Sequence, residues 1–137
     1  MREDSILVSP APWAKLRLAA EILLIYVQAR WAMGKEELEP LVARLRASKF
    51  EPVPLSQADR IHLAATVMHL LGVLPTDSRC LVRSLVLLSL LQRRGLTSTL
   101  VIGVRSEPDF AAHAWIEYGA EALLPTGGGE FARLTEI

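Results

Sequence analysis

The chain has 137 residues, of which 15 are basic and 15 acidic, so its formal net charge is zero. Hydrophobic residues make up 51% of it, and it contains one cysteine. The balanced charge without a basic block argues against a nucleic-acid binder, and the apolar content argues against a disordered chain. The lone cysteine excludes an internal disulfide. The length suits one domain over residues 1–137 that buries a core without disulfides or metals.

The N-terminal sequence lacks the marks of secretion or membrane insertion. MREDSILVSP does not have the basic-then-apolar order of a secretory signal. The most apolar early run, Leu18 to Val27, is short and carries Glu21. We therefore expect a cytoplasmic protein with a reduced thiol and no stable membrane insertion. The high apolar content favours a tight core first and a partner-binding surface second.

Residues 1–75 are expected to be mainly helical. After a short apolar run at residues 6–8, the segment Trp13 to Met33 carries apolar residues at helical spacing and should end at Gly34. A shorter helix is expected over Glu36 to Ala47, where Pro40 is tolerable only in the first turn.

Two further helices follow. Ser56 and Asp59 form a capping-box pattern, and the helix behind them should run to about Leu71. The most apolar helix is expected over Ser78 to Arg94, closed by Gly95.

After this helix the period of the pattern changes from 3.6 to 2. The segments 98–106 and 112–119 alternate as strands do, and 121–125 and 131–137 are candidates for a third and a fourth strand. The order predicts an α+β domain in which the N-terminal helices precede a catalytic part, residues 76–137, made of a central helix and a small antiparallel meander. Residues 81–91 should be buried between the sheet and the earlier helices.

The only cysteine lies in the first turn of this apolar helix. Asp77 or Thr76 is the expected N-cap, which places Cys80 at the third helical position or one residue deeper. The unpaired N–H groups and the positive end of the helix dipole stabilise a thiolate there, and Arg79 and Arg83 could add to this. The backbone N–H of Cys80 is also a natural oxyanion donor. The alternative interpretation is a small buried hydrophobic residue.

A histidine can serve as the partner of this thiol. Alternation places His113, Trp115 and Glu117 on one face of the second predicted strand. That strand, packed on the cysteine helix, can bring imidazole and sulfur within hydrogen-bond reach. The other histidines, His62 and His69, lie seven residues apart beside apolar neighbours, and we expect packing residues or at most surface residues. Further ligands with recognisable spacing are lacking, so we expect no metal site.

Three stretches together resemble a known family. CLVRSLVLLSLLQRRGL, LVIGVR and HAWIEY closely resemble the transglutaminase-like, papain-like domain of the lasso-peptide maturation proteases, which remove the leader from a ribosomally made precursor. The resemblance is strong over Arg79 to Tyr118 and looser after it. It implies that Cys80 attacks the scissile carbonyl and that His113 is its base.

The resemblance also implies partners. The helical N-terminal half fits the small stand-alone form of the family, in which leader recognition belongs to a separate polypeptide. The expected partners are thus the leader of the precursor peptide, a separate leader-recognition protein and an ATP-dependent macrolactam-forming cyclase. No cofactor is expected.

The third catalytic residue departs from the family pattern. That pattern often has an acidic residue about twelve positions after the histidine, where this chain has Pro125 and Thr126. If residues 119–120 form a two-residue turn, His113 faces Thr126, so Thr126 or a backbone carbonyl could hold the ring. Glu117 shares the face of the histidine but lies roughly 13 Å along the strand. We expect a cysteine–histidine dyad with Thr126 and Glu117 as candidate orienters.

Two other functions fit the same residues. Acyl transfer of the transglutaminase type uses an amine in place of water, and a non-catalytic peptide-binding module would explain the missing carboxylate. The glycine run at residues 127–129 lacks the lysine and the strand–loop–helix context of a phosphate-binding loop, so we interpret it as a flexible connection.

Overall fold

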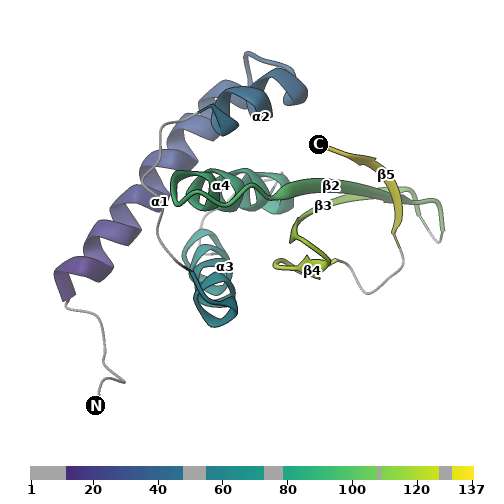
Figure 1. Cartoon of the computed structure of the whole chain (residues 1–137). Helices are drawn as coiled ribbons and strands as arrows, with labels where there is room; N and C mark the ends of the chain where they lie inside the picture. The colour runs from purple at the N-terminus through teal and green to yellow at the C-terminus, as the bar shows by residue number, and fades with distance from the viewer. Residues whose placement is uncertain (1–11, 48–54, 73–78, 108, 127–130) are drawn as a thin grey trace.

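The computed structural model describes residues 12–47, 55–72, 79–107, 109–126 and 131–137. Within these residues four helices precede a four-stranded antiparallel sheet, which confirms the predicted α+β class (Figure 1). The elements are α1 (Pro12–Met33), α2 (Leu38–Arg46), α3 (Gln57–Leu71), α4 (Arg79–Arg93), β2 (Thr99–Arg105), β3 (Ala111–Tyr118), β4 (Glu121–Ala122) and β5 (Ala132–Glu136). The apolar run at 6–8, the N-cap expected at 76 or 77 and the glycine run lie outside the described residues.

The helix ends follow the local signals closely. Helix α1 ends before Gly34, as predicted. Helix α2 begins two residues later than predicted because Glu37, in extended conformation, is its N-cap, and Pro40 lies in its first turn. In front of α3 the Ser56 hydroxyl accepts the Asp59 N–H at 3.1 Å, and the Asp59 carboxylate accepts the Ser56 N–H at 3.0 Å. The capping box is therefore confirmed.

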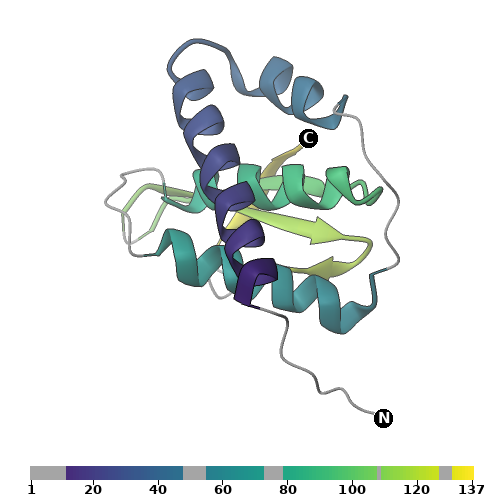
Figure 2. The ribbon, with the colours of Figure 1, turned by 90° about the vertical axis from the view of Figure 1, so that its left-hand side faces the viewer.

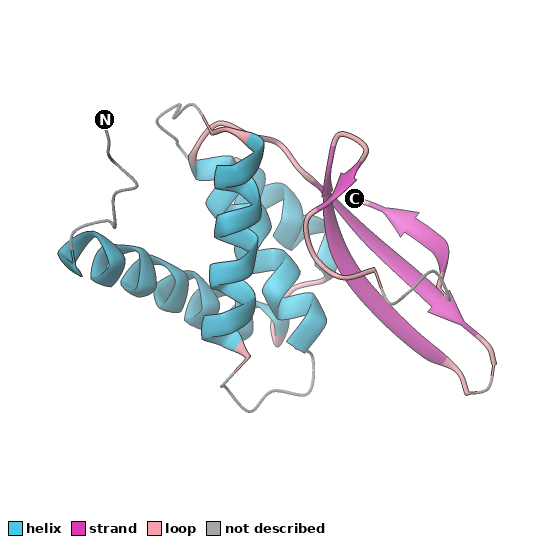
Figure 3. Ribbon diagram, turned by 90° about the horizontal axis from the view of Figure 1, so that it is seen from below, coloured by secondary structure: helices cyan, strands magenta, loops and turns pink. Residues whose placement is uncertain are grey.

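Helix α4 forms the centre of the molecule. Five of its leucines are at most 1% exposed: Leu85, Leu87, Leu88, Leu90 and Leu91. Helices α1, α2 and α3 pack against one side of α4, and strands β2 and β3 pack against the other. Figure 2 shows α1 crossing in front of α4 with the sheet behind, and Figure 3 shows the helices gathered on one side of the sheet. The prediction that this helix is buried between the two layers is confirmed.

The sheet is not the predicted meander. Its strand order is β4-β3-β2-β5, so the last strand pairs with β2 at the opposite edge from β4. Strand β4 has only two residues, because Leu123 and Leu124 turn into the core, where they are 8% and 5% exposed. The chain then leaves this edge. Its C-terminus joins β2 instead, where Leu100 and Ile137 exchange both backbone hydrogen bonds at 2.9 and 2.8 Å.

The hairpin between β3 and β4 has the predicted turn. Tyr118 pairs with Glu121, which leaves Gly119 and Ala120 as a two-residue loop. Gly119 has φ +62°, a left-handed conformation that glycine adopts without strain.

None of the helices in the described ranges combines the length and the apolar character that a membrane crossing requires.

Arg46 fastens α2 to the C-terminal edge of the sheet. Its guanidinium donates from Nη2 to the carbonyl oxygens of Ser98 and Ile137, both at 2.6 Å. Burial lowers the pKa of Arg46, but a guanidinium stays charged at neutral pH.

Replacing Arg46 by methionine should lower the free energy of unfolding by about 2 kcal/mol, because two hydrogen bonds from a charged donor are lost and the Ser98 carbonyl loses this partner, while the Ile137 carbonyl keeps its bond from Leu100. Urea unfolding followed by circular dichroism measures the change. Arg44→Met is the matched control on the same helix: Arg44 pairs with Glu36 at the surface, with 57% of its side chain exposed, and should cost about 0–1 kcal/mol. Equal effects of the two substitutions would contradict the role of Arg46.

Candidate active site

Cys80 is the second residue of α4 and is partly buried. The helical position expected for Cys80 depends on an N-cap at residue 76 or 77, which lies outside the described residues. In this first turn the backbone N–H groups have no acceptor within their own helix. The Cys80 carbonyl accepts the Ser84 hydroxyl at 2.7 Å. The thiol therefore lies in the first described turn of a buried helix, partly buried against the core.

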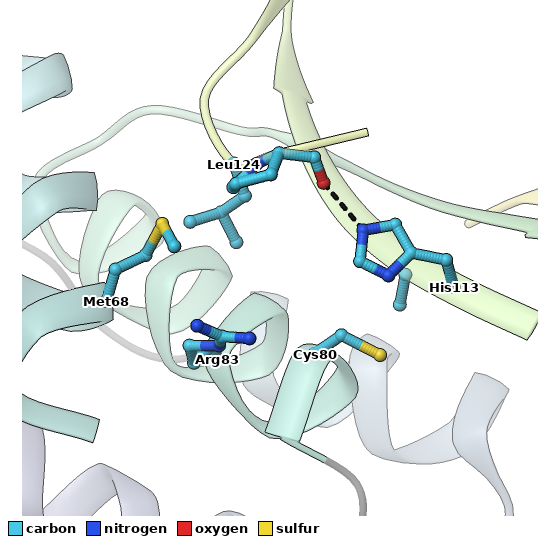
Figure 4. Close-up of a pocket in the computed structure, with 7 residues that line it drawn as sticks. Met68, Cys80, Arg83, His113 and Leu124 are labelled. Atoms are coloured by element: carbon cyan, nitrogen blue, oxygen red, sulfur yellow. Dashed lines mark hydrogen bonds between the residues drawn. The ribbon is translucent and has the colours of Figure 1, made fainter. Parts of the chain in front are cut away.

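His113 lies on β3 opposite Gly103 of β2. Its Nε2 is 2.7 Å from the carbonyl oxygen of Pro125. Because a carbonyl only accepts hydrogen bonds, this contact assigns the proton to Nε2 and leaves Nδ1 of the neutral ring as an acceptor. In Figure 4 the second ring nitrogen is turned to the side on which the Cys80 sulfur lies.

The two predicted catalytic residues share one small pocket. It holds about 30 Å³ and is lined by Met68, Cys80, Arg83, His113, Ala114, Leu124 and Pro125. Such a volume accommodates about one water molecule. Strand β4 pairs with β3 only at Glu117 and Tyr118, so His113 lies beyond the paired part of that edge. Chain segments far apart in the sequence thus place a thiol and an imidazole around one water-sized space.

The two side chains considered as orienters are placed differently from the ring. Glu117 accepts the indole N–H of Trp115 at 2.9 Å and a guanidinium N–H of Arg133 at 2.5 Å. Thr126 directly follows the carbonyl that holds Nε2, and the hydrogen bond to the ring comes from the Pro125 backbone. In the described part of the chain, a backbone carbonyl therefore holds the imidazole ring, which was the alternative to the Thr126 hydroxyl.

Aromatic rings hold the imidazole from the sides. Its centroid lies 5.8 Å from that of Trp115 and 5.3 Å from that of Phe131, with interplanar angles of 30° and 37°. Gly103 makes room for both. A Cβ there would lie 2.9 Å from the Cβ of Phe131 and 3.0 Å from the indole of Trp115. Sequence reasoning missed Gly103 and Phe131, although a glycine inside a strand is a signal of close approach.

The Glu117 carboxylate, which accepts the indole N–H of Trp115, is stabilised in its charged form. Burial by itself would raise the pKa of Glu117, but hydrogen bonds from Trp115 and Arg133, together with the positive charge of Arg133, outweigh it and lower that pKa. The hydrogen bond to Glu117, together with its negative charge, raises the pKa of Arg133.

The remaining histidines are separate from this site. His62 and His69 lie on α3 and are exposed, so the expectation that they pack is wrong and the surface alternative holds. The buried stripe of α3 consists of Leu63, Ala64, Val67 and Leu71, and both histidines fall outside it. Among the described residues there is no cluster of three or more potential metal ligands.

The model of the transglutaminase-like superfamily matches residues 23–136. The match spans most of the chain, including α4, its cysteine and the whole sheet, so this chain belongs to the transglutaminase-like superfamily. The superfamily includes cysteine proteases and acyltransferases, and its members are typically catalytic. Neither the curated proteins nor the solved structures yield a match to this chain.

Gly103→Ala should destabilise the fold by about 1–3 kcal/mol, because the new methyl group collides with Phe131 and Trp115. It should also shift the imidazole NMR signals of His113, whose aromatic neighbours must move. Gly34→Ala is the control, because its Cβ would meet only one carbonyl oxygen, at an ordinary 3.6 Å. A Gly103→Ala protein with native stability and native His113 signals would show that this close packing is absent.

Glu117→Gln should make the protein less sensitive to acid. Because the pKa of Glu117 is lower in the folded chain than its usual 4.5, the unfolded chain binds the proton first as pH falls. The wild-type contribution is thus complete above that value and is lost as pH drops through the lowered pKa. The urea midpoints of unfolding of wild type and variant should differ at pH 7 and should converge at about pH 3. A difference that grows at low pH would contradict the assignment.

Proposed function

We propose that this chain is a cysteine peptidase that removes the leader from a ribosomally synthesised lasso-peptide precursor. Three observations support the proposal: the close resemblance of residues 79–118 to the maturation proteases, the membership of a superfamily that includes cysteine proteases, and the pocket shared by Cys80 and His113. The observation that carries it is the hydrogen bond between His113 Nε2 and the Pro125 carbonyl, since it leaves Nδ1 available as a base toward the thiol.

The first half of the reaction forms an acyl-enzyme. Nδ1 of His113 takes the thiol proton while the sulfur of Cys80 attacks the scissile carbonyl carbon of the leader. Backbone N–H groups at the start of α4, including that of Cys80, bind the resulting oxyanion. The imidazolium then donates its proton to the amine of the core peptide, and the C–N bond breaks as the amine leaves.

The second half releases the leader. His113 takes a proton from a water molecule, and the hydroxide attacks the thioester carbon. The C–S bond breaks, and the imidazolium returns its proton to the sulfur. The leader departs with a new carboxylate. The core peptide has gained a free amine, which is the nucleophile that an ATP-dependent macrolactam-forming cyclase requires.

A separate leader-recognition protein is part of the proposal. The pocket of Cys80 and His113 has room for about one water molecule and is lined by only seven residues. That small site supplies little area for the selection of a long leader, since specific interfaces bury on the order of 1,200–2,000 Å². We therefore propose that the recognition protein delivers the leader and that the transglutaminase-like domain cuts it.

Cys80→Ala should abolish processing, and His113→Ala should slow it by roughly 10⁴-fold, because nucleophile and base act as a unit. Thr126→Ala should stay within about threefold of wild type, since a backbone carbonyl and not this hydroxyl holds the ring. The measurement is mass spectrometry of precursor peptide incubated with the chain and the recognition protein, with circular dichroism to show that each variant is folded.

The same assay separates the alternatives. Leader adducts of an added primary amine, formed in preference to hydrolysis, would identify an acyltransferase. Full processing by Cys80→Ala would leave the chain as a non-catalytic binding module. Equal turnover with and without the recognition protein would remove the partner from the proposal but not the peptidase.

A further inference from the structure

Helix α1 has an apolar outer face. Of the nine large hydrophobic residues that are exposed in the described part of the chain, six belong to α1, with exposures from 40 to 69%. We call them the outer face of α1: Trp13, Leu16, Leu23, Leu24, Val27 and Trp31. At 100° per residue they fall within an arc of about 100°, and at 1.5 Å per residue they extend over about 27 Å. Exposed apolar patches of this kind mark interaction sites.

This face is not the one that α1 uses to fold. The side packed on α4 carries Ile22, Ile25, Ala29 and Ala32, each at most 3% exposed. The helix is therefore apolar on two opposite faces, which is expected of a helix covered on both. In Figure 1 α1 lies on the side of the molecule away from the sheet. The pocket of Cys80 and His113 contains no residue of α1.

The charges around the outer face have one sign. By helical position Arg17 borders one edge of the stripe and Arg30 the other, and both are exposed. Glu21 is the only acidic residue of α1. Its carboxylate is turned to α4, where it pairs with Arg93 at 3.4 Å and Arg94 at 3.0 Å.

We propose that the outer face of α1 binds an amphipathic helix of a partner protein whose apolar stripe is bordered by acidic residues. Spacings of three and four residues along a narrow stripe match the ridges of a packed helix. The bordering cations select an acidic partner by charge complementarity. A hollow lined by Tyr26, Val27, Arg30, Trp31, Met33 and Gly34 lies beside one end of the stripe. This hollow is shallow and open to solvent, and a side chain of the bound helix can rest in it.

A second copy of this chain fits the face less well. Two outer faces packed together would bring Arg17 and Arg30 of both copies into one interface, with Glu21 already committed to α4. Like charges across an interface oppose association. A lipid surface is disfavoured because α1 carries only three cations, Lys15, Arg17 and Arg30, spread over its length, fewer than the clusters of basic residues that bind anionic membranes.

The test uses a designed 21-residue helical peptide with leucines on one stripe and glutamates along both borders, and a control peptide with lysines in place of the glutamates. Tryptophan emission reports binding, because Trp13 and Trp31 are 66% and 67% exposed, whereas Trp115 is buried. The acidic peptide should shift the emission to the blue and bind at least tenfold more tightly than the basic one.

Variants of the full chain make the test specific. Leu24→Glu combined with Val27→Glu should weaken binding of the acidic peptide at least tenfold, while Ile61→Glu on α3, which starts at a similar 51% exposure, should leave it unchanged. Arg17→Glu combined with Arg30→Glu should reverse the preference toward the basic peptide. Cys80→Ala should bind normally, so the result stands apart from the proposed peptidase activity.

Four outcomes would overturn the inference. Equal affinity for both peptides, or no binding of either, would rule out an acidic helix as the ligand of this face. Dimerisation in sedimentation equilibrium that Leu24→Glu with Val27→Glu abolishes would assign the face to a second copy. Binding to phosphatidylserine-containing vesicles, lost in the same variant and without peptide binding, would assign it to a membrane.

Discussion

The burial of α4 on all sides is the constraint on which the site depends. Its leucines lie between two layers, and each fully buried leucine contributes about 1.5–3 kcal/mol. Neither a shift along the helix axis nor a rotation of α4 is possible without exposing that surface. Cys80 lies in the first described turn of α4, is partly buried, and lines the pocket that it shares with His113. The cysteine is thus positioned by the core although its sulfur lies at the boundary of the core.

The end of strand β4 completes the site around Cys80 and His113. Because Leu123 and Leu124 turn into the core, β4 stops after two residues and the chain passes His113 as irregular backbone. That path presents the Pro125 carbonyl to the ring. A carbonyl fixes the tautomer of the imidazole as a carboxylate would, but it brings only a partial charge to balance an imidazolium. The contacts with Trp115 and Phe131 supply the remaining orientation.

Features encoded within a few residues could be predicted from the sequence. The Ser56 capping box, the turn at Gly119 and the burial of α4 are of this kind, because each depends on local pattern alone. The edge at which β5 pairs was not predictable in this way, since it depends on backbone hydrogen bonds between Leu100 and Ile137, which lie far apart in the sequence.

The surroundings of His113 could likewise be predicted only in part from the sequence. The pocket shared with Cys80 follows the strand alternation and the position of the cysteine in its helix. The group that contacts Nε2 does not follow, because a backbone carbonyl leaves no mark in the identity of a side chain. The sequence offers Glu117 as an acidic candidate on the same face, but its carboxylate accepts a hydrogen bond from Trp115 and not from His113.

The most direct test of this site is the protonation of the His113 ring in the resting protein, measured by long-range ¹H–¹⁵N NMR of ¹⁵N-labelled imidazole. The contact with Pro125 predicts a proton on Nε2, slow to exchange because the carbonyl accepts it, and, in the neutral form of the ring, no proton on Nδ1. A neutral ring protonated on Nδ1 alone, or an even mixture of the two neutral tautomers, would contradict the proposed arrangement in which Nδ1 of His113 serves Cys80 as a base.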